Sequence, residues 1–185
     1  MNKFKQIVTA VTLAVVGFAA NANLVTNGDF EAGNAGWTQD NFTAGAFNGF
    51  TPFGTTALYG GCVGQLCSTS QTIATVAGQS YLFSFAYGSD GQAPNEFIAL
   101  FGGQTVFHTI NDSLDTRPGY LLESFLVTAD SASTVIDFQI RNDPSWQSVD
   151  NVSVESANAV PEPGTLALMG LGLAGLAGAR RRKAK

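Results

Sequence analysis

SYLFSFAYG, residues 80–88, carries an aromatic ring at every second position. Because successive side chains of a β-strand point to opposite faces, Tyr81, Phe83, Phe85 and Tyr87 share one face, and smaller residues share the other. A turn sequence, AGQ, comes directly before this stretch. A single strand cannot bury four rings by itself, so the stretch predicts a strand that packs against other strands in a β-domain.

Six further segments have the composition of strands, and turn-forming clusters separate them at spacings of roughly ten residues. They are SQTIATV (70–76), NEFIALFG (95–102), TVFHTIN (105–111), GYLLESFLVTA (119–129), TVIDFQIRN (134–142) and WQSVDNVSV (146–154). In the fifth of them, Ile136, Phe138 and Ile140 form one apolar face. No part of this region has sustained helical periodicity. We therefore predict an all-β fold in which two antiparallel sheets pack as a sandwich.

The N-terminal end differs in character from this region. Residues 1–22 begin with Lys3 and Lys5, continue through an apolar stretch and end in Ala-Asn-Ala. This is the layout of a cleavable secretory signal peptide, which predicts a signal helix and export. A first membrane helix is the alternative, although the apolar stretch is short for one.

The middle region, residues 23–163, is strongly acidic. It holds all 14 Asp and Glu residues but only two of the nine Lys and Arg residues, Arg117 and Arg141, so its formal charge is 2 − 14 = −12. Such a surface repels phosphate, which argues against binding to nucleic acid or anionic lipid. It suits a neutral partner, or a cation such as calcium.

The two cysteines, Cys62 and Cys67, lie close together in GGCVGQLCS. An exported chain meets an oxidising compartment, so this spacing predicts a disulfide that closes a small loop. A metal site is the alternative. It would lack a second Cys/His pair, because the chain has a single histidine, His108.

Three segments of the middle region resemble, in this order, the galactose-binding-like jelly rolls of carbohydrate-binding modules. They are NLVTNGDFEAGNAGW (23–37), SQTIATVAGQSYLFSFAYG (70–88) and RNDPSWQSVDNVSVES (141–156). The resemblance implies a jelly-roll domain over residues 23–156, with the first and last strands side by side. Such domains often hold a structural calcium there, and Asp29, Glu31 and Asp150 would supply its oxygen ligands. The alternative is that these carboxylates only cap turns and strand ends.

The C-terminal end resembles the PEP-CTERM sorting signal of exported proteins in Gram-negative bacteria. Its characteristic residues are Val160, Pro161, Glu162 and Pro163, followed after an apolar run by Arg180, Arg181 and Arg182. In this interpretation a linker (157–163) leads to a short transmembrane helix (164–179) and a basic cytoplasmic tail (180–185). The resemblance implies processing by an exosortase-type membrane protease, then transfer to the cell surface or extracellular matrix. A plain anchor that is never cut is the alternative.

The middle region contains little that predicts catalysis. It has neither a G-x-S-x-G nor an H-E-x-x-H motif, and His108 fits an exposed strand position. We therefore expect a protein that is not an enzyme. A glycoside hydrolase is the enzymatic alternative, because a pair of carboxylates is sufficient for that chemistry.

Sugar binding requires an aromatic face and nearby hydrogen-bonding groups. The residues that combine these properties are Arg141, Asn142, Trp146, Tyr87 and Tyr59. We predict an exported, non-catalytic protein that binds extracellular or cell-surface polysaccharide. A structural matrix or surface protein without a small ligand is the rival interpretation. An ice-binding protein is a more distant one, because the chain has no regular T-x-T ladder.

Overall fold

A computed structural model describes residues 22–40, 46–48, 53–117 and 119–157, which form ten β-strands and no helix. The strands are β1 (Thr38–Asp40), β2 (Ala46–Asn48), β3 (Thr56–Gly60), β4 (Cys67–Ala74), β5 (Ser80–Ser89), β6 (Asn95–Phe101), β7 (Gln104–Ile110), β8 (Leu121–Thr128), β9 (Ser133–Asn142) and β10 (Gln147–Ser156). The signal helix, the membrane span and the sorting motif predicted above lie outside the described residues. Among the residues that are described, there is no helix of the length and apolarity needed to cross a membrane.

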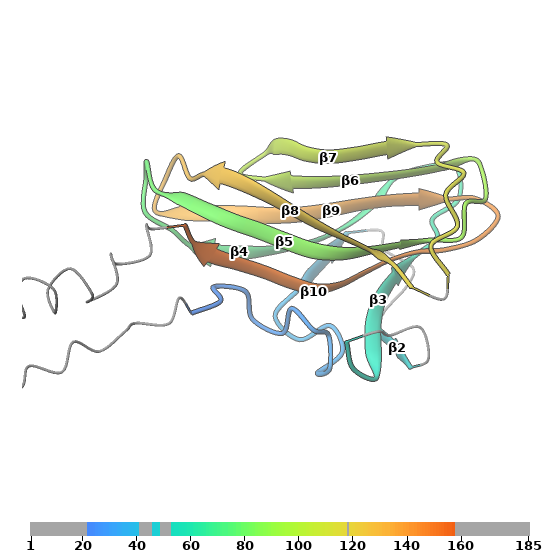
Figure 1. The fold of residues 1–185 in the computed structure, drawn as a ribbon, viewed down its shortest axis with the longest axis horizontal. Coiled ribbons are helices and arrows are strands. Elements are labelled where there is room, and N and C mark those ends of the chain that lie inside the picture. The colour runs from blue at the N-terminus through green and yellow to red at the C-terminus, as the bar shows by residue number, and fades with distance from the viewer. Residues whose placement is uncertain (1–21, 41–45, 49–52, 118, 158–185) are drawn as a thin grey trace, which may run out of the picture. The chain divides into compact units, whose positions relative to one another are not determined.

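The strands form two antiparallel five-stranded sheets that lie in two layers (Figure 1). Sheet A has the order β1-β4-β9-β6-β7, and sheet B has the order β2-β3-β10-β5-β8. Most spatial neighbours are distant in sequence; for example, β10 lies between β3 and β5. This arrangement confirms the predicted all-β sandwich, and its connections are those of a jelly roll.

Aromatic side chains fill the space between the sheets. Phe83 and Phe85 of β5 contact Phe138 of β9, with ring centroids 5.9 and 5.1 Å apart. Phe97 of β6 lies 6.0 Å from the same ring. All four rings are buried, and each stabilises the fold by about 1.5–3 kcal/mol on transfer from water. Because these partners come from both sheets, the rings hold the two layers together.

The N-terminal segment attaches to the last strand through its N-G-D-F-E sequence. The Gly28 carbonyl accepts a hydrogen bond from the Val152 amide at 2.8 Å, and a β-carbon at Gly28 would collide with the Val152 carbonyl oxygen. Phe30 is buried against Trp37, with centroids 5.2 Å apart. The Trp37 indole N–H donates to the Asn27 carbonyl at 3.1 Å. This motif therefore serves as a structural anchor beside β10.

Cys62 and Cys67 form the predicted disulfide. Cys67 is the buried first residue of β4, and the Cys62 carbonyl accepts a hydrogen bond from the Asn142 amide at 3.1 Å. The bridge thus fixes the loop before β4 against the end of β9. The loop that connects β9 to β10 begins there and carries Trp146.

Candidate functional site

An open cleft lies at the end of the sandwich where β5 and β9 finish and β10 begins. It has a volume of about 140 Å³ and is lined by Tyr59, Gly88, Ser89, Asp90, Arg117, Ser145, Trp146 and Ser148. Strand register creates it, because Ser148 of β10 pairs with Tyr59 of β3 on one side and with Gly88 of β5 on the other. Typical small-molecule pockets hold roughly 300–1,000 Å³. The cleft is therefore suited to one face or one end of a ligand.

Trp146 provides an aromatic surface at this cleft, and its side chain is 48% exposed. The buried side chain of Asn142 fixes the backbone of the loop that carries Trp146, because its oxygen accepts a hydrogen bond from the Ser145 amide at 3.1 Å. Gly61 lies against the indole, and a β-carbon there would be 3.1 Å from the ring. The loop therefore presents the indole to solvent with its backbone fixed.

Charged groups line the cleft beside this ring. The Arg117 guanidinium donates two hydrogen bonds to the Asp115 carboxylate, at 2.8 and 2.7 Å. These bonds lower the pKa of Asp115 to about 2. The same bonds, and then the charges of Asp115 and Asp90, raise the pKa of Arg117. The cleft therefore offers a permanent cation and a neighbouring carboxylate, both able to bind hydroxyl groups.

Tyr59 stays a neutral phenol in this environment. Burial, and after it the charge of Asp150, raises the pKa of Tyr59 to about 12. The hydroxyl is therefore protonated across the physiological pH range.

The structure brings together two of the five predicted sugar-binding residues, Tyr59 and Trp146. Tyr87 requires a correction: its side chain is fully buried in the core, and its hydroxyl accepts a hydrogen bond from the side-chain Nε2 of Gln147 at 3.0 Å, so it has no face to offer a ligand. Asn142 is also fully buried and positions the loop instead. Arg141 lines a separate hollow with Glu96 and Asn111.

Arg141 forms an ion pair with Asp143 on that separate surface. Its Nε atom donates to the Asp143 carboxylate at 2.8 Å, and Asp143 also accepts a hydrogen bond from the Gly64 amide at 2.9 Å. The guanidinium therefore stabilises the corner between β9 and the disulfide loop. It lies outside the lining of the cleft.

Sequence reasoning missed Asp90 and Arg117 as residues of this cleft. One signal pointed to Arg117, since it is one of only two cations in residues 23–163. The loop that carries it is tied to β5, because the Ser89 amide donates to the Thr116 hydroxyl at 3.0 Å. That contact joins residues 27 positions apart. The local sequence pattern around either residue does not predict such a contact.

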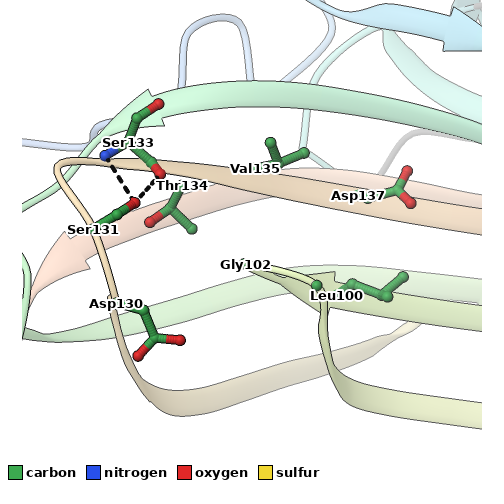
Figure 2. Close-up of a pocket in the computed structure, with 9 residues that line it drawn as sticks. Leu100, Gly102, Asp130, Ser131, Ser133, Thr134, Val135 and Asp137 are labelled. Atoms are coloured by element: carbon green, nitrogen blue, oxygen red, sulfur yellow. Dashed lines mark hydrogen bonds between the residues drawn. The ribbon is translucent and has the colours of Figure 1, made fainter.

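A second hollow, of about 410 Å³, lies at the opposite end of β9 (Figure 2). Asp130 and Ser131 of the β8–β9 turn line it together with Ser133 and Asp137 of β9. Burial raises the pKa of Asp137, although its hydrogen bond from Gln139 opposes that effect. The hollow has no aromatic side chain in its lining. The Trp146 cleft is therefore the better candidate for a sugar.

The three predicted calcium ligands have different environments. Asp150 is 3% exposed; one oxygen accepts a hydrogen bond from the Asn151 amide at 2.7 Å, and the other is buried and has no hydrogen-bond partner among the described residues. Burial, and then the charges of Asp29 and Glu31, raises the pKa of Asp150 to about 6. A buried acceptor near two other carboxylates is a chemical fit for a cation.

Glu31 fits that role less well, because its carboxylate is already bonded. It accepts hydrogen bonds from the Thr55 amide and hydroxyl, both at 2.6 Å, and from the Thr56 amide at 2.9 Å. These bonds lower the pKa of Glu31 to about 2. Among the described residues, no three His, Cys, Asp or Glu side chains are grouped so as to hold a metal ion. The Glu31 carboxylate thus caps the turn before β3.

Comparison with known proteins identifies the C-terminal end and the fold. Residues 159–183 match the PEP-CTERM protein-sorting motif. This motif implies export and a C-terminal membrane anchor before processing. A search of curated proteins finds no match for the chain.

Among solved structures, the fold is similar to a family 16 carbohydrate-binding module, with 16% identity, a TM-score of 0.53, and coverage of 71% of this chain and 99% of that one. It is also similar to a family 61 module solved with β-1,4-galactotriose, with 13% identity, a TM-score of 0.56, and coverage of 73% and 99%. A Stig cyclase from Fischerella has the same fold, with 15% identity, a TM-score of 0.55, and coverage of 76% and 100%. At these identities the likeness establishes the jelly-roll fold and nothing further.

Proposed function

We infer that this protein is an exported, surface-sorted binding protein for extracellular or cell-surface polysaccharide, with no catalytic role. The observation that carries the proposal is the exposed Trp146 indole beside Tyr59, Asp90 and Arg117 in one cleft. Sugar rings stack their C–H faces on aromatic rings, and neighbouring polar groups bind the hydroxyls. The structural similarity to carbohydrate-binding modules supports the fold side of the argument.

The charge of the domain favours neutral glycans. Residues 23–163 have a formal charge of −12, and Arg117 already bonds Asp115. A polyanionic polysaccharide would meet net repulsion over the whole surface. A neutral chain would not, and its hydroxyls suit both the guanidinium and the Asp90 carboxylate.

The location of the cleft also suits a domain attached by its C-terminus. β10 begins at Gln147, beside the cleft, and ends at Ser156, so the described chain leaves the sandwich at the opposite end (Figure 1). Ten residues of strand cover roughly 33 Å. The cleft therefore lies at the other end of β10 from Ser156.

The experiment is a neutral-glycan array probed with the exported protein, followed by titration of the best glycan. Trp146→Ala should weaken binding about tenfold or more, which is about 1.4 kcal/mol or more. Phe53→Ala is the matched control, because Phe53 is an aromatic with 41% exposure that lies outside the cleft lining. Equal loss in both variants would contradict the proposed site.

Two other outcomes would assign a different class of function. No binding to any glycan would favour a structural matrix or surface protein. Release of a shortened sugar product would favour a hydrolase, and the residues for that reaction would need to be found elsewhere than at Trp146.

We also propose that Asp150, together with Asp29, holds a structural cation such as calcium. The buried, unpartnered oxygen of Asp150 supports this, and oxygen ligands suit that ion. The ion would stabilise the junction between the N-terminal segment and β10 without acting on a ligand.

A further inference from the structure

The eight-residue strand β8 is an edge of sheet B. It pairs with β5 over eight consecutive positions without a bulge, and no described strand lies on its other side. Within the described part of the chain, its outer backbone groups pair with no strand. Natural edges are commonly protected by charged side chains, Pro or a bulge; Leu121–Thr128 has no Pro and no bulge, and its single charged residue is Glu123, on the half-buried inner face.

The other edge strand on this side of the sandwich, β7, contrasts with it. The β6–β7 ladder contains a register shift between Ala99 and Leu100. A bulge of this kind twists an edge and discourages pairing. The exposed face of β7 also carries His108, which bonds Glu96 at 2.9 Å. The available edge is therefore β8.

The solvent face of β8 is apolar. Leu122 and Leu126 are 68% and 72% exposed, and Leu82 of β5, which lies opposite Leu126, is 44% exposed. Ser124 lies between the two β8 leucines on the same face. In a domain with the net charge described above, this uncharged stripe along a free edge is an interaction surface.

We propose that β8 pairs antiparallel with β8 of a second copy, with a two-fold axis at Ser124. In this register Leu122 lies opposite the partner's Leu126, and Leu126 lies opposite the partner's Leu122. On the inner face, Leu121 lies opposite the partner's Val127. Such an interface is isologous, as closed dimers require, and it joins the two B sheets into one.

Other registers are worse for physical reasons. Residues that lie opposite each other in paired strands point to the same side of the sheet. A two-fold axis between two copies of β8 must therefore lie at one residue, which then pairs with its own copy. An axis at Glu123 would set two carboxylates opposite each other, and like charges in that position are destabilising. An axis at Phe125 would leave Leu122 opposite the partner's Thr128. Only the axis at Ser124 places both exposed leucines of β8, Leu122 and Leu126, opposite a leucine of the partner.

Pairing through β8 would change how the protein binds glycan, an inference that rests on the proposed function. Antiparallel strands reverse the direction of the second copy, so the two Trp146 clefts would lie at opposite ends of the dimer. A dimer of this form would be bivalent and would link two glycan chains.

The test is disulfide trapping in the full chain, because Cys62 and Cys67 are bonded to each other and leave no free cysteine in the structure. Facing residues of paired strands lie roughly 4.5–5.5 Å apart between Cα atoms, which suits a disulfide. Ser124→Cys should therefore give a covalent dimer on a non-reducing gel as the main species. Thr128→Cys is the matched control, because it lies on the same exposed face but roughly 26 Å from the partner's Thr128 in this register.

Two more measurements make the test decisive. On a non-reducing gel, the Leu122→Cys and Leu126→Cys proteins should each run largely as a monomer when tested alone. A mixture of the two should form a covalent dimer. Adding Leu126→Lys to Ser124→Cys should abolish the dimer, and its exposed position keeps the core intact. Equal cross-linking of the Thr128 and Ser124 variants, or none by Ser124→Cys, would overturn the proposal. Neither result depends on glycan binding, so the proposed function is judged separately on the glycan array.

Discussion

Asp150→Asn removes a carboxylate that the fold buries at the junction of the N-terminal segment and β10. Burial and two neighbouring carboxylates raise the pKa of Asp150 from 3.8 to about 6. One pKa unit corresponds to about 1.4 kcal/mol of differential interaction, so a shift of roughly two units corresponds to about 3 kcal/mol. Ionisation of Asp150 should therefore lower the free energy of unfolding by about this amount in the absence of a cation.

The sign of the pH dependence follows from linkage. Because the folded-state pKa is the higher one, the folded protein binds the proton more tightly than the unfolded chain. The stabilising contribution is complete below pH 3.8 and is lost as the pH rises through about 6. In chelator, Asp150→Asn should be more stable than the wild type by up to about 3 kcal/mol at neutral pH, and nearly equal to it in acid.

The assay is urea unfolding of the exported protein, followed by tryptophan fluorescence in EDTA at about pH 4 and about pH 7.5. Glu31→Gln is the control of opposite sign, because hydrogen bonds from Thr55 lower the pKa of Glu31 to about 2 and the carboxylate form stabilises the fold. That variant should lose stability at neutral pH. An Asp150→Asn protein that is less stable than the wild type at neutral pH in EDTA would refute the electrostatic reasoning.

The same samples test the cation. Added calcium should stabilise the wild type at neutral pH, because a ligand that binds only the folded state adds to its stability. It should leave Asp150→Asn unchanged. If calcium has no effect on the wild type, Asp150 is a buried carboxylate without a cation.

Three further outcomes are expected. Phe138→Ala should lower the free energy of unfolding by about 3–5 kcal/mol, measured in urea, because it removes a fully buried ring that contacts both sheets; a loss below about 1 kcal/mol would contradict the packing. The exported protein should show no reactive thiol until it is reduced, and labelling of Cys62 or Cys67 in unreduced protein would contradict the disulfide. In a host with its sorting enzyme, mass spectrometry should find a mature C-terminus that lacks residues 180–185, and in a host without the enzyme the tail should remain. An intact tail in the first host would identify the C-terminal end as a plain anchor.

The alternation of side chains along each strand could be predicted from sequence, because pleating alone sets a period of two. The rings of Tyr81, Phe83 and Phe85 point inward as the pattern at residues 80–88 predicts. Tyr87 shares that face and is buried with them. Its assignment to a sugar site therefore contradicted the pattern from which the strand itself was predicted.

Features that depend only on residues close together in the sequence could also be predicted. The disulfide joins cysteines only five positions apart, so export context and spacing were sufficient to predict it. The sorting motif at residues 159–183 is a linear signal that is recognised as sequence. Neither feature depends on which strands become neighbours.

The tertiary structure alone decided the cleft and the free edge. Tyr59, Gly88 and Ser148 meet because β10 inserts between β3 and β5, and the loop with Arg117 reaches them through a contact to Ser89. The same strand order leaves β8 with no neighbouring strand on one side among the residues that the structure describes. The sequence of a strand predicts which of its faces is apolar. Its neighbours in the sheet depend on how all the strands pair, because segments far apart in the chain compete for the same backbone hydrogen bonds.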